Sequence, residues 1–278
     1  MIKVDKCPFC NQKNRTEVQK QEFNDVYIDL INPELNKEVR YWYECDNCNF
    51  LYRSPKLDEK EQEILYEKYR DVSFRNETAD EYFTRITSYD NENSENYQKI
   101  SWFLEKINNN ILEQKNKVLD VGCGGGVLLH KIKDMLPKSL TYGVEPNILY
   151  SNLARDRSNA VEIKTSYFYK NLFEEKFDII VSSDVLEHVD KPTVFLKDIY
   201  YSLRKNGILF LEIPSPTNFN ELKSEHDMFN IAHHVFYTEN IIKEYLINTG
   251  FEHIMIKDIK NNSNVWKLRI IAYKQSRW

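Results

Sequence analysis

The stretch Lys117–Ile132 reads KVLDVGCGGGVLLHKI and decides the fold. An apolar run typical of a buried strand leads directly into a glycine-rich turn, and the residues after the turn have the apolar spacing of a helix. Four of the chain's seven glycines lie between Gly122 and Gly126. Backbone without side chains lets a bulky ligand approach closely. The stretch therefore predicts a strand, a ligand-binding loop and a helix.

Further segments with strand character follow this stretch at regular intervals. We predict strands at 117–122, 139–145, 160–165, 177–183 and 207–214, and a final hairpin from 251–259 and 265–274. Helical segments separate the first five, which predicts an α/β fold with a parallel sheet and helices on both faces. Ligands of such sheets bind at the carboxyl ends of the strands, where the glycine loop lies.

Three classes of ligand are candidates for the glycine loop. A phosphate-binding P-loop needs GxxxxGK[ST], which the sequence lacks. A dinucleotide fingerprint fails because Val127 or Leu129 stands where the third glycine would be. A nucleoside without phosphate remains, since Asp120 precedes the loop and Glu145 ends the second strand, where a carboxylate can accept both ribose hydroxyls. Such a carboxylate, beside a loop without lysine, suits a ligand with an ammonium or sulfonium group.

The motifs VLDVGCGGG, YGVEP, FDIIVSSDVLEHV and GILFLEIPSP occur in one order across residues 117–214. This order resembles that of class I S-adenosylmethionine-dependent methyltransferases, which implies a Rossmann-like sheet, this cofactor and methyl transfer. At matching positions the resemblance implies the following contacts. Asp120 holds the methionine amino group, the backbone of Gly122, Cys123 and Gly124 lines the methionine, Glu145 with Pro146 beside it grips the ribose, Ser166 and Tyr167 meet the adenine, and Ser183 and Asp184 flank the methyl group.

Four of the five cysteines form two CxxC pairs, Cys7 with Cys10 and Cys45 with Cys48. Two such turns can supply four thiolates in a tetrahedron, which suits a structural zinc ion. The alternative, a redox pair, needs a single CxxC near a βαβ unit. Asn11 and Asn49 follow the pairs, and asparagine tolerates the left-handed conformation expected there.

Two runs between the pairs, 26–31 and 38–44, have strand character and flank the turn NPELNK. We therefore predict a hairpin and a zinc ribbon over residues 1–53. A ribbon followed by a proline turn and an amphipathic helix resembles the zinc-ribbon methyltransferases of bacterial sugar and surface-polysaccharide pathways.

Residues 54–110 have helical spacing, and we predict two or three helices with a break at 108–110. Most aromatic residues here suit core packing. Tyr82, Phe83 and Arg85 are candidates to roof a cofactor pocket on the methyltransferase domain, predicted at 111–278, with Arg85 facing a carboxylate.

A weak nucleophile such as a sugar hydroxyl needs a base for methyl transfer. Candidates concentrate in SEHDMFNIAHHVFYTENII, from which we select His233 and His234, and His188 lies in the DVLEHV motif. Sugar C-methyltransferases have a histidine-aromatic cluster at a comparable place. The alternative is that this stretch only packs the next helix, which Thr238 would cap and Gly250 would end.

The chain has 278 residues and a net charge of −5, which disfavours generic nucleic-acid binding. No apolar stretch reaches about 18 residues and no signal peptide is visible, so we expect a cytoplasmic protein without a membrane partner. We predict methylation of a small polar acceptor, a nucleotide-linked sugar or polysaccharide precursor, on oxygen rather than carbon. The alternatives are an RNA methyltransferase that grips RNA with the ribbon and a cofactor-binding protein without catalysis.

Overall fold

The computed structural model describes residues 1–68, 76–107, 114–174 and 176–275. A seven-stranded sheet has the order β10-β11-β8-β7-β4-β5-β6. These strands are β4 (Lys117–Val121), β5 (Leu140–Glu145), β6 (Glu162–Thr165), β7 (Phe177–Ser183), β8 (Leu203–Pro214), β10 (Phe251–Lys260) and β11 (Trp266–Lys274). Five strands pair in parallel, and the β10–β11 hairpin closes one edge antiparallel to β8. The Rossmann-like α/β prediction is confirmed.

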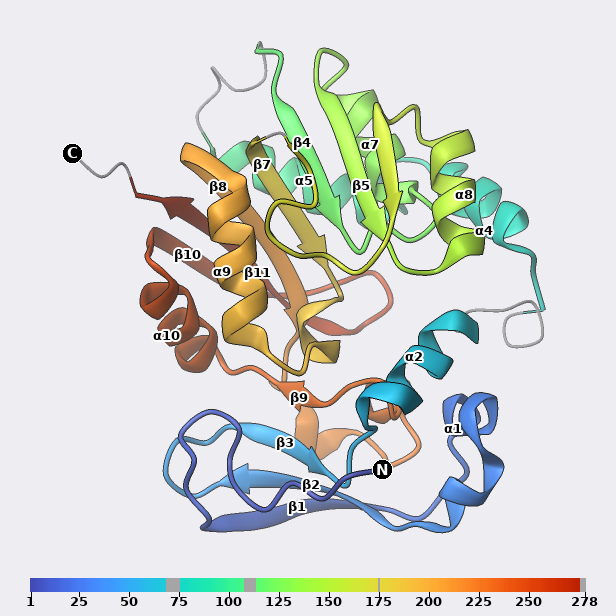
Figure 1. Ribbon diagram of the computed structural model, residues 1–278, viewed down its shortest axis with the longest axis vertical. Coiled ribbons are helices and arrows are strands. Elements are labelled where there is room, and N and C mark those ends of the chain that lie inside the picture. Colours follow the sequence, from blue (N-terminus) through green and yellow to red (C-terminus); the bar gives the residue numbers. More distant parts are fainter. Residues whose placement is uncertain (69–75, 108–113, 175, 276–278) are drawn as a thin grey trace.

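Helices cover both faces of this sheet (Figure 1). They are α4 (Ala79–Thr87), α5 (Glu95–Lys106), α7 (Val127–Met135), α8 (Ile148–Arg157), α9 (Pro192–Ser202) and α10 (Glu239–Thr249). Alternate residues of β4 enter different cores, since Leu119 packs with the α9–α10 side and Val118 with the α5–α7 side. Thr238 caps α10, and Gly250 ends it in the left-handed conformation, as predicted.

The middle segment is helical, as the apolar spacing predicts. α2 (Glu59–Lys68) begins with a reciprocal cap, in which Asp58 and Glu61 each accept the other's backbone N–H at 2.9 Å. The predicted break at 108–110 lies outside the described residues. Among the described residues, no helix has the length and apolar character needed to cross a membrane.

A second, smaller sheet has the order β1-β2-β3-β9, with β1 at Arg15–Gln21, β2 at Arg40–Cys45, β3 at Leu51–Ser54 and β9 at Val235–Phe236. The prediction of a strand at 26–31 is wrong, because this segment is the helix α1 (Val26–Ile31), followed by the 3-10 turn Pro33–Lys37. Asp25 starts α1 by accepting the N–H of Tyr27 at 2.9 Å, and Ile28 is buried with Leu65 of α2. The predicted strand at 38–44 is confirmed as β2, but its partners are β1 and β3.

The small sheet is continuous with the rest of the molecule, because β3 pairs with β9. Trp42 of β2 packs on Phe236 of β9 with ring centroids 4.8 Å apart, and buried Arg53 donates to the carbonyl oxygen of Phe229. Residues 1–53 therefore share a core with a segment that follows β8. Figure 1 shows the small sheet below the carboxyl ends of the parallel strands, with α2 between the two sheets.

Candidate active site

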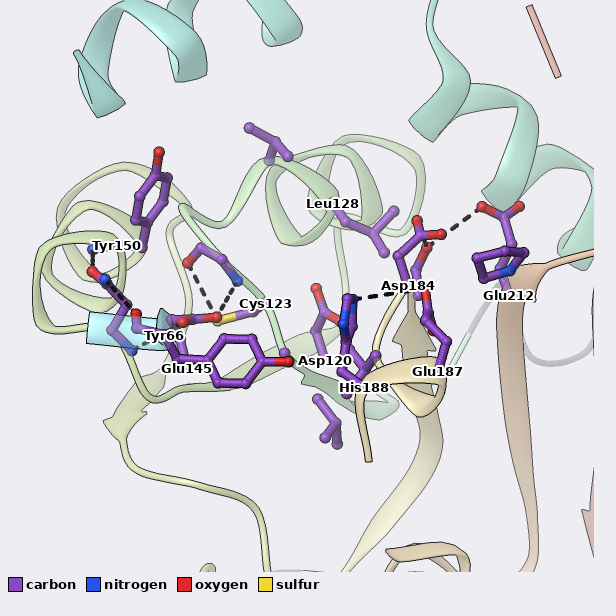
Figure 2. A pocket seen from close by; sticks show the side chains of 18 of the residues that line it. Tyr66, Asp120, Cys123, Leu128, Glu145, Tyr150, Asp184, Glu187, His188 and Glu212 are labelled. Carbon is purple, nitrogen blue, oxygen red and sulfur yellow. Dashed lines mark hydrogen bonds and ion pairs between the residues drawn. The ribbon is translucent and has the colours of Figure 1, made fainter. Parts of the chain in front are cut away.

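A cavity of about 1680 Å³ lies between the carboxyl ends of the parallel strands, α2 and the loop before β9. A cavity for one drug-sized ligand measures about 300–1,000 Å³, so this one has room for two molecules. In Figure 2, Glu145 and Tyr66 lie on one side, Asp184, Glu187 and His188 on the other, and Asp120 between them.

The glycine loop between β4 and α7 forms one wall of the cavity. Gly122 and Gly124 have φ angles of 80° and 52°, which favour glycine. A Cβ at Gly122 would lie 2.4 Å from a methyl carbon of Val185, whereas a Cβ at Gly124 would meet no atom within 4 Å. The backbone at Gly124 therefore faces open space, as close approach of a ligand requires.

Glu145 lies at the end of β5 and is fixed by the loops on either side of it. Its Oε2 accepts the N–H of Gly124 at 3.0 Å and its Oε1 accepts the N–H of Asn147 at 2.9 Å. A carboxylate oxygen accepts more than one hydrogen bond, so ribose hydroxyls can join these donors. The Asn147 side chain also donates to the carbonyl oxygen of Tyr66, which ties α2 to this rim.

Asp120 lies at the floor of the cavity and is only 2% exposed. Burial, with a smaller contribution from the Glu145 carboxylate, raises the pKa of Asp120 to about 7, against the opposing effect of the Lys99 ammonium. A cationic group bound beside Asp120 would favour its ionised form.

Ser183 and Asp184, predicted to flank the methyl group, belong to a buried charge network. Lys99 Nζ lies 2.8 Å from Ser183 Oγ and 2.8 Å from Glu212, and Lys267 pairs with Asp184. Burial alone would raise the pKa of Asp184, but Lys267 and Lys99 hold it well below its usual range. Asp184 has a φ of 56°, a conformation that L residues rarely adopt. The network therefore fixes this wall.

The acceptor-side cluster consists of Glu187, His188 and His233, which come together from two loops. Nδ1 of His188 lies 2.8 Å from the carbonyl oxygen of Ala232, and Nδ1 of His233 lies 2.7 Å from that of Met228. Both Nδ1 atoms therefore donate to these carbonyl oxygens, which leaves Nε2 as the lone-pair nitrogen of a neutral ring. The ring centroids are 4.8 Å apart.

Burial changes the ionisation of the acceptor-side cluster. The carboxyl group of Glu187 is 1% exposed, and its oxygens make no hydrogen bond to the described residues. Burial, with the nearby Asp184 carboxylate, raises the pKa of Glu187 to about 8. Burial, with His188 beside it, lowers the pKa of His233 well below its usual value.

His234, the remaining candidate base, does not line the cavity. It is 3% exposed, and its Nδ1 lies 3.0 Å from Asp190. The same carboxylate pairs with Lys56 and accepts a hydrogen bond from Gln62 at 2.7 Å. Through Asp190, His234 thus links the segment before β9 to Lys56 and Gln62, near the start of α2.

The other predicted cofactor contacts line the cavity: Cys123, Pro146, Ser166, Tyr167, Tyr82 and Arg85. The Arg85 guanidinium faces a carboxylate of the chain itself, since it donates to both oxygens of Glu77 at 2.9 and 2.7 Å. Tyr167 is 52% exposed, whereas Cys123 is buried, which raises the pKa of its thiol well above the usual value.

Sequence reasoning missed Tyr66, Lys99, Lys267 and Glu212, which also line the cavity. Glu187 was visible in the DVLEHV motif but has the appearance of a helix-start residue. For the two lysines the only local signal is a charged residue at an apolar helix or strand position, because Lys99 lies 113 residues before its partner Glu212 and Lys267 lies 83 residues after its partner Asp184.

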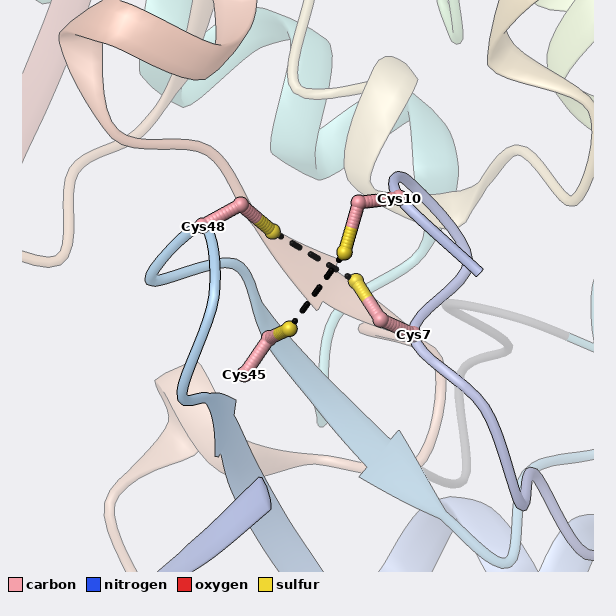
Figure 3. A group of neighbouring side chains, drawn as sticks. All are labelled: Cys7, Cys10, Cys45 and Cys48. Carbon is pink, nitrogen blue, oxygen red and sulfur yellow. Dashed lines mark hydrogen bonds between the residues drawn. The ribbon is translucent and has the colours of Figure 1, made fainter. Parts of the chain in front are cut away.

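The four cysteines of the two CxxC pairs converge in the first fifty residues (Figure 3). The Sγ atoms of Cys7 and Cys48 are 3.6 Å apart, and those of Cys10 and Cys45 are 3.5 Å apart. Four thiolates at about 2.3 Å from a tetrahedral zinc ion lie about 3.8 Å from one another, so the cluster fits this ion. Asn11 and Asn49, with φ angles of 62° and 58°, adopt the predicted left-handed conformation. These residues would hold zinc in a closed, structural site.

A Rossmann-like sheet, a glycine loop after its first strand and acids at the ends of β4 and β5 define a class I S-adenosylmethionine-dependent methyltransferase. Residues 88–255 match the family model described as "Methyltransferase domain". The chain belongs to this family.

The curated proteins similar to this chain include two kinds of enzyme. The chain is 27% identical over 169 residues to a tRNA U34 carboxymethyltransferase from Sulfurovum sp., with 55% of each chain covered. It is 29% identical over 118 residues to a ubiquinone biosynthesis O-methyltransferase from Histophilus somni, which covers 39% of this chain and 48% of that protein. The chain thus spans about half the length of the curated relatives it matches.

Solved structures share the fold. Magnesium protoporphyrin IX methyltransferase from Synechocystis with bound S-adenosylhomocysteine has a TM-score of 0.56 and 15% identity, over 76% of this chain and 99% of that chain. A Haloferax volcanii complex between the Trm112 methyltransferase activator and a methyltransferase contains a chain with a TM-score of 0.55 and 13% identity, over 72% of this chain and 96% of that chain.

Proposed function

We propose that this methyltransferase transfers the methyl group to a hydroxyl oxygen of a small polar molecule that binds beside the cofactor in the same cavity. One observation carries the proposal. Glu187 and His188, which cluster with His233, lie across the cavity from Glu145 (Figure 2). Groups that act on a hydroxyl proton therefore face the site proposed for the cofactor.

The cofactor half of the cavity is the glycine loop with Asp120 and Glu145. We assign the methionine ammonium to Asp120, because its buried carboxyl group lines the cavity and has little competing solvent. We assign the ribose hydroxyls to Glu145, which two backbone N–H groups hold in place. Ser166 and Tyr167 remain the proposed adenine contacts, since both line the cavity beyond β6.

The acceptor half is the acceptor-side cluster together with Tyr27 of α1. Tyr66 of α2 lies between the two halves, since it is beside Glu145 in Figure 2 and its ring centroid is 6.0 Å from that of His188. The acceptor oxygen attacks the methyl carbon in line with the sulfur, the electron pair of the carbon–sulfur bond stays on sulfur, and the hydroxyl proton leaves toward the cluster. Alignment and exclusion of water are the main contributions of the protein to such a displacement. The charge network of Asp184 holds the wall between the two halves.

The charge of the lining favours a small uncharged or cationic acceptor over a phosphate backbone. Its lysines and arginines are Arg85, Lys99, Lys191 and Lys267. Three of these pair with carboxylates of the chain. Its acids are Glu59, Glu63, Asp90, Glu95, Asp120, Glu145, Asp184, Glu187, Asp190, Asp198, Glu212 and Asp227. Nucleic-acid binding depends on clustered cations that neutralise phosphates.

RNA is the second candidate acceptor, because several relatives are named tRNA U34 carboxymethyltransferases. A sugar-derived acceptor stays a prediction from the sequence motifs, and the relatives reported above are named for tRNA and for ubiquinone biosynthesis.

The experiment incubates the full chain with S-adenosylmethionine labelled in the methyl group. Separate reactions receive total tRNA or a small-molecule extract that contains polyols, nucleotide sugars and phenols. We expect S-adenosylhomocysteine and a labelled product of low mass with the extract alone. Acid-precipitable label that becomes acid-soluble only after ribonuclease treatment would replace this proposal with the RNA alternative. Cofactor binding without turnover in either reaction would favour a non-catalytic protein.

A further inference from the structure

We infer that Glu187, His188 and His233 bind one divalent transition-metal ion in the acceptor half of the cavity, at a site separate from the four cysteines. The inference rests on the proposed function, because the ion would lie where the acceptor hydroxyl is expected. It adds a chemical role for the cluster that the methyltransferase fold does not itself require.

The three side chains have nearly the spacing of a metal site. One ligand atom from each residue lies within 4.8 Å of the other two, and Glu187 Oε1 is 3.8 Å from His188 Nε2. Ligand atoms at about 2.1 Å from a common ion lie about 3.0–3.4 Å apart. Small side-chain rotations would therefore bring the three atoms to an ion.

The imidazole rings already have the orientation of metal ligands. Each Nδ1 donates to a backbone carbonyl oxygen, His188 to Ala232 at 2.8 Å and His233 to Met228 at 2.7 Å. Metal-binding histidines usually make such an outer hydrogen bond, which fixes the tautomer and directs the other nitrogen toward the ion. The two carbonyl oxygens come from the same loop before β9, so one short segment orients both rings.

Glu187 supplies an independent indication of a cation. Its carboxyl group is almost fully buried, it lines the cavity, and neither oxygen has a hydrogen-bond partner among the described residues. Buried polar groups in proteins are nearly always satisfied, so an orphaned carboxyl group requires an explanation. An ion shared with two imidazoles would satisfy it.

The ligand set selects the kind of ion. Two imidazoles with one carboxylate suit Mn²⁺, Fe²⁺, Co²⁺ or Zn²⁺, whereas Mg²⁺ and Ca²⁺ prefer oxygen ligands throughout. Three protein ligands also leave coordination positions open, unlike the closed set of four thiolates. With the three side chains bound to the ion, an acceptor hydroxyl at an open position would release its proton to water rather than to an imidazole of the cluster, and the resulting alkoxide would attack the methyl carbon.

The test uses the full chain with zinc bound at the four cysteines and Co²⁺ as the probe. Native mass spectrometry counts the ions per chain, and visible absorption distinguishes nitrogen and oxygen ligands from thiolates. We expect one Co²⁺ in addition to zinc, without a thiolate charge-transfer band. Absence of a second ion, or a second ion bound with a thiolate spectrum, would overturn the inference.

Variants locate the ion. Glu187→Gln and His233→Ala should each weaken Co²⁺ binding at least about tenfold, whereas Asp198→Asn, which removes a different carboxylate of the same cavity, should keep it. Binding of S-adenosylhomocysteine at wild-type affinity confirms that each variant is folded. Equal Co²⁺ affinity in wild type and both cluster variants would also overturn the inference. Methyl transfer by metal-free chain would overturn the metal's role alone and leave the proposed function intact.

Discussion

The cofactor half and the acceptor half of the cavity are built in different ways. Asp120, the glycine loop and Glu145 lie on two adjacent parallel strands within thirty residues of sequence. The acceptor half joins the 3-10 turn after β7 (Leu186–His188) to the loop before β9, α1 and α2. Local sequence thus brings together the proposed cofactor half, whereas the tertiary fold brings together the proposed acceptor half. The two halves should therefore respond separately to substitution.

The largest expected effect is on turnover when the acceptor half loses an imidazole. His233→Ala should lower kcat about 100-fold or more, because groups that act on the proton of a nucleophile contribute about 10²–10⁴ in rate. The affinity for S-adenosylhomocysteine, measured by calorimetry, should stay within about twofold of wild type. The matched control is His253→Ala, an exposed histidine of β10. If His233→Ala lowered the affinity for S-adenosylhomocysteine by as large a factor as it lowers kcat, the two halves would not be separable.

The converse substitution removes Glu145, the side chain of the cofactor half that we propose binds the ribose. Glu145→Ala should weaken S-adenosylhomocysteine binding about 10- to 100-fold, as expected for loss of charge-assisted hydrogen bonds of about 1.5–3 kcal/mol. At saturating cofactor, kcat should change little. Glu63→Ala, which removes an acid of α2 from the same cavity, is the control. Unchanged affinity in Glu145→Ala would count against the ribose assignment.

A smaller, pH-dependent effect belongs to Asp120. Its pKa is about 7 without ligand, and a bound ammonium requires the ionised form. The affinity for S-adenosylhomocysteine should therefore fall as the pH falls through 7, by about tenfold between pH 8 and pH 6. Asp120→Asn should bind weakly at both pH values, and a wild-type affinity independent of pH would contradict the assignment.

The smallest effect on the cofactor half should come from the four cysteines. Cys7→Ser should release zinc, measured by mass spectrometry, and lower the melting temperature, because metal binding contributes to the folding of a small sheet. Loosening would spread through the β3–β9 pairing to the loop that holds His233. We therefore expect a lower kcat with S-adenosylhomocysteine affinity within about twofold of wild type. Retention of a full equivalent of zinc would contradict the four-thiolate site.

Sequence reasoning predicted most of the sheet, and it selected Asp120, the glycine loop and Glu145, which line one cavity, because each strand, loop and acid there belongs to a contiguous pattern. It also predicted the cysteine cluster, since CxxC spacing is itself the geometry of a thiolate turn. It mistook 26–31 for a strand because a short apolar run fits both structures, and the cap at Asp25 decided the outcome.

The acceptor half was predicted only in part. His188 and His233 were selected by residue type, but their meeting depends on how the loop before β9 folds against the turn after β7. The pairing of Lys99 with Glu212 and of Lys267 with Asp184 joins segments remote in sequence. A two-residue strand such as β9 has no periodicity that could reveal its attachment to β3.

The β3–β9 pairing has a consequence for biosynthesis. The cysteine pairs leave the ribosome early, but the strand that completes their sheet is translated only after the entire parallel core through β8. The edge of β3 therefore stays exposed on the nascent chain until the parallel core and β9 have been made. Metal captured early would protect the nascent chain during that interval.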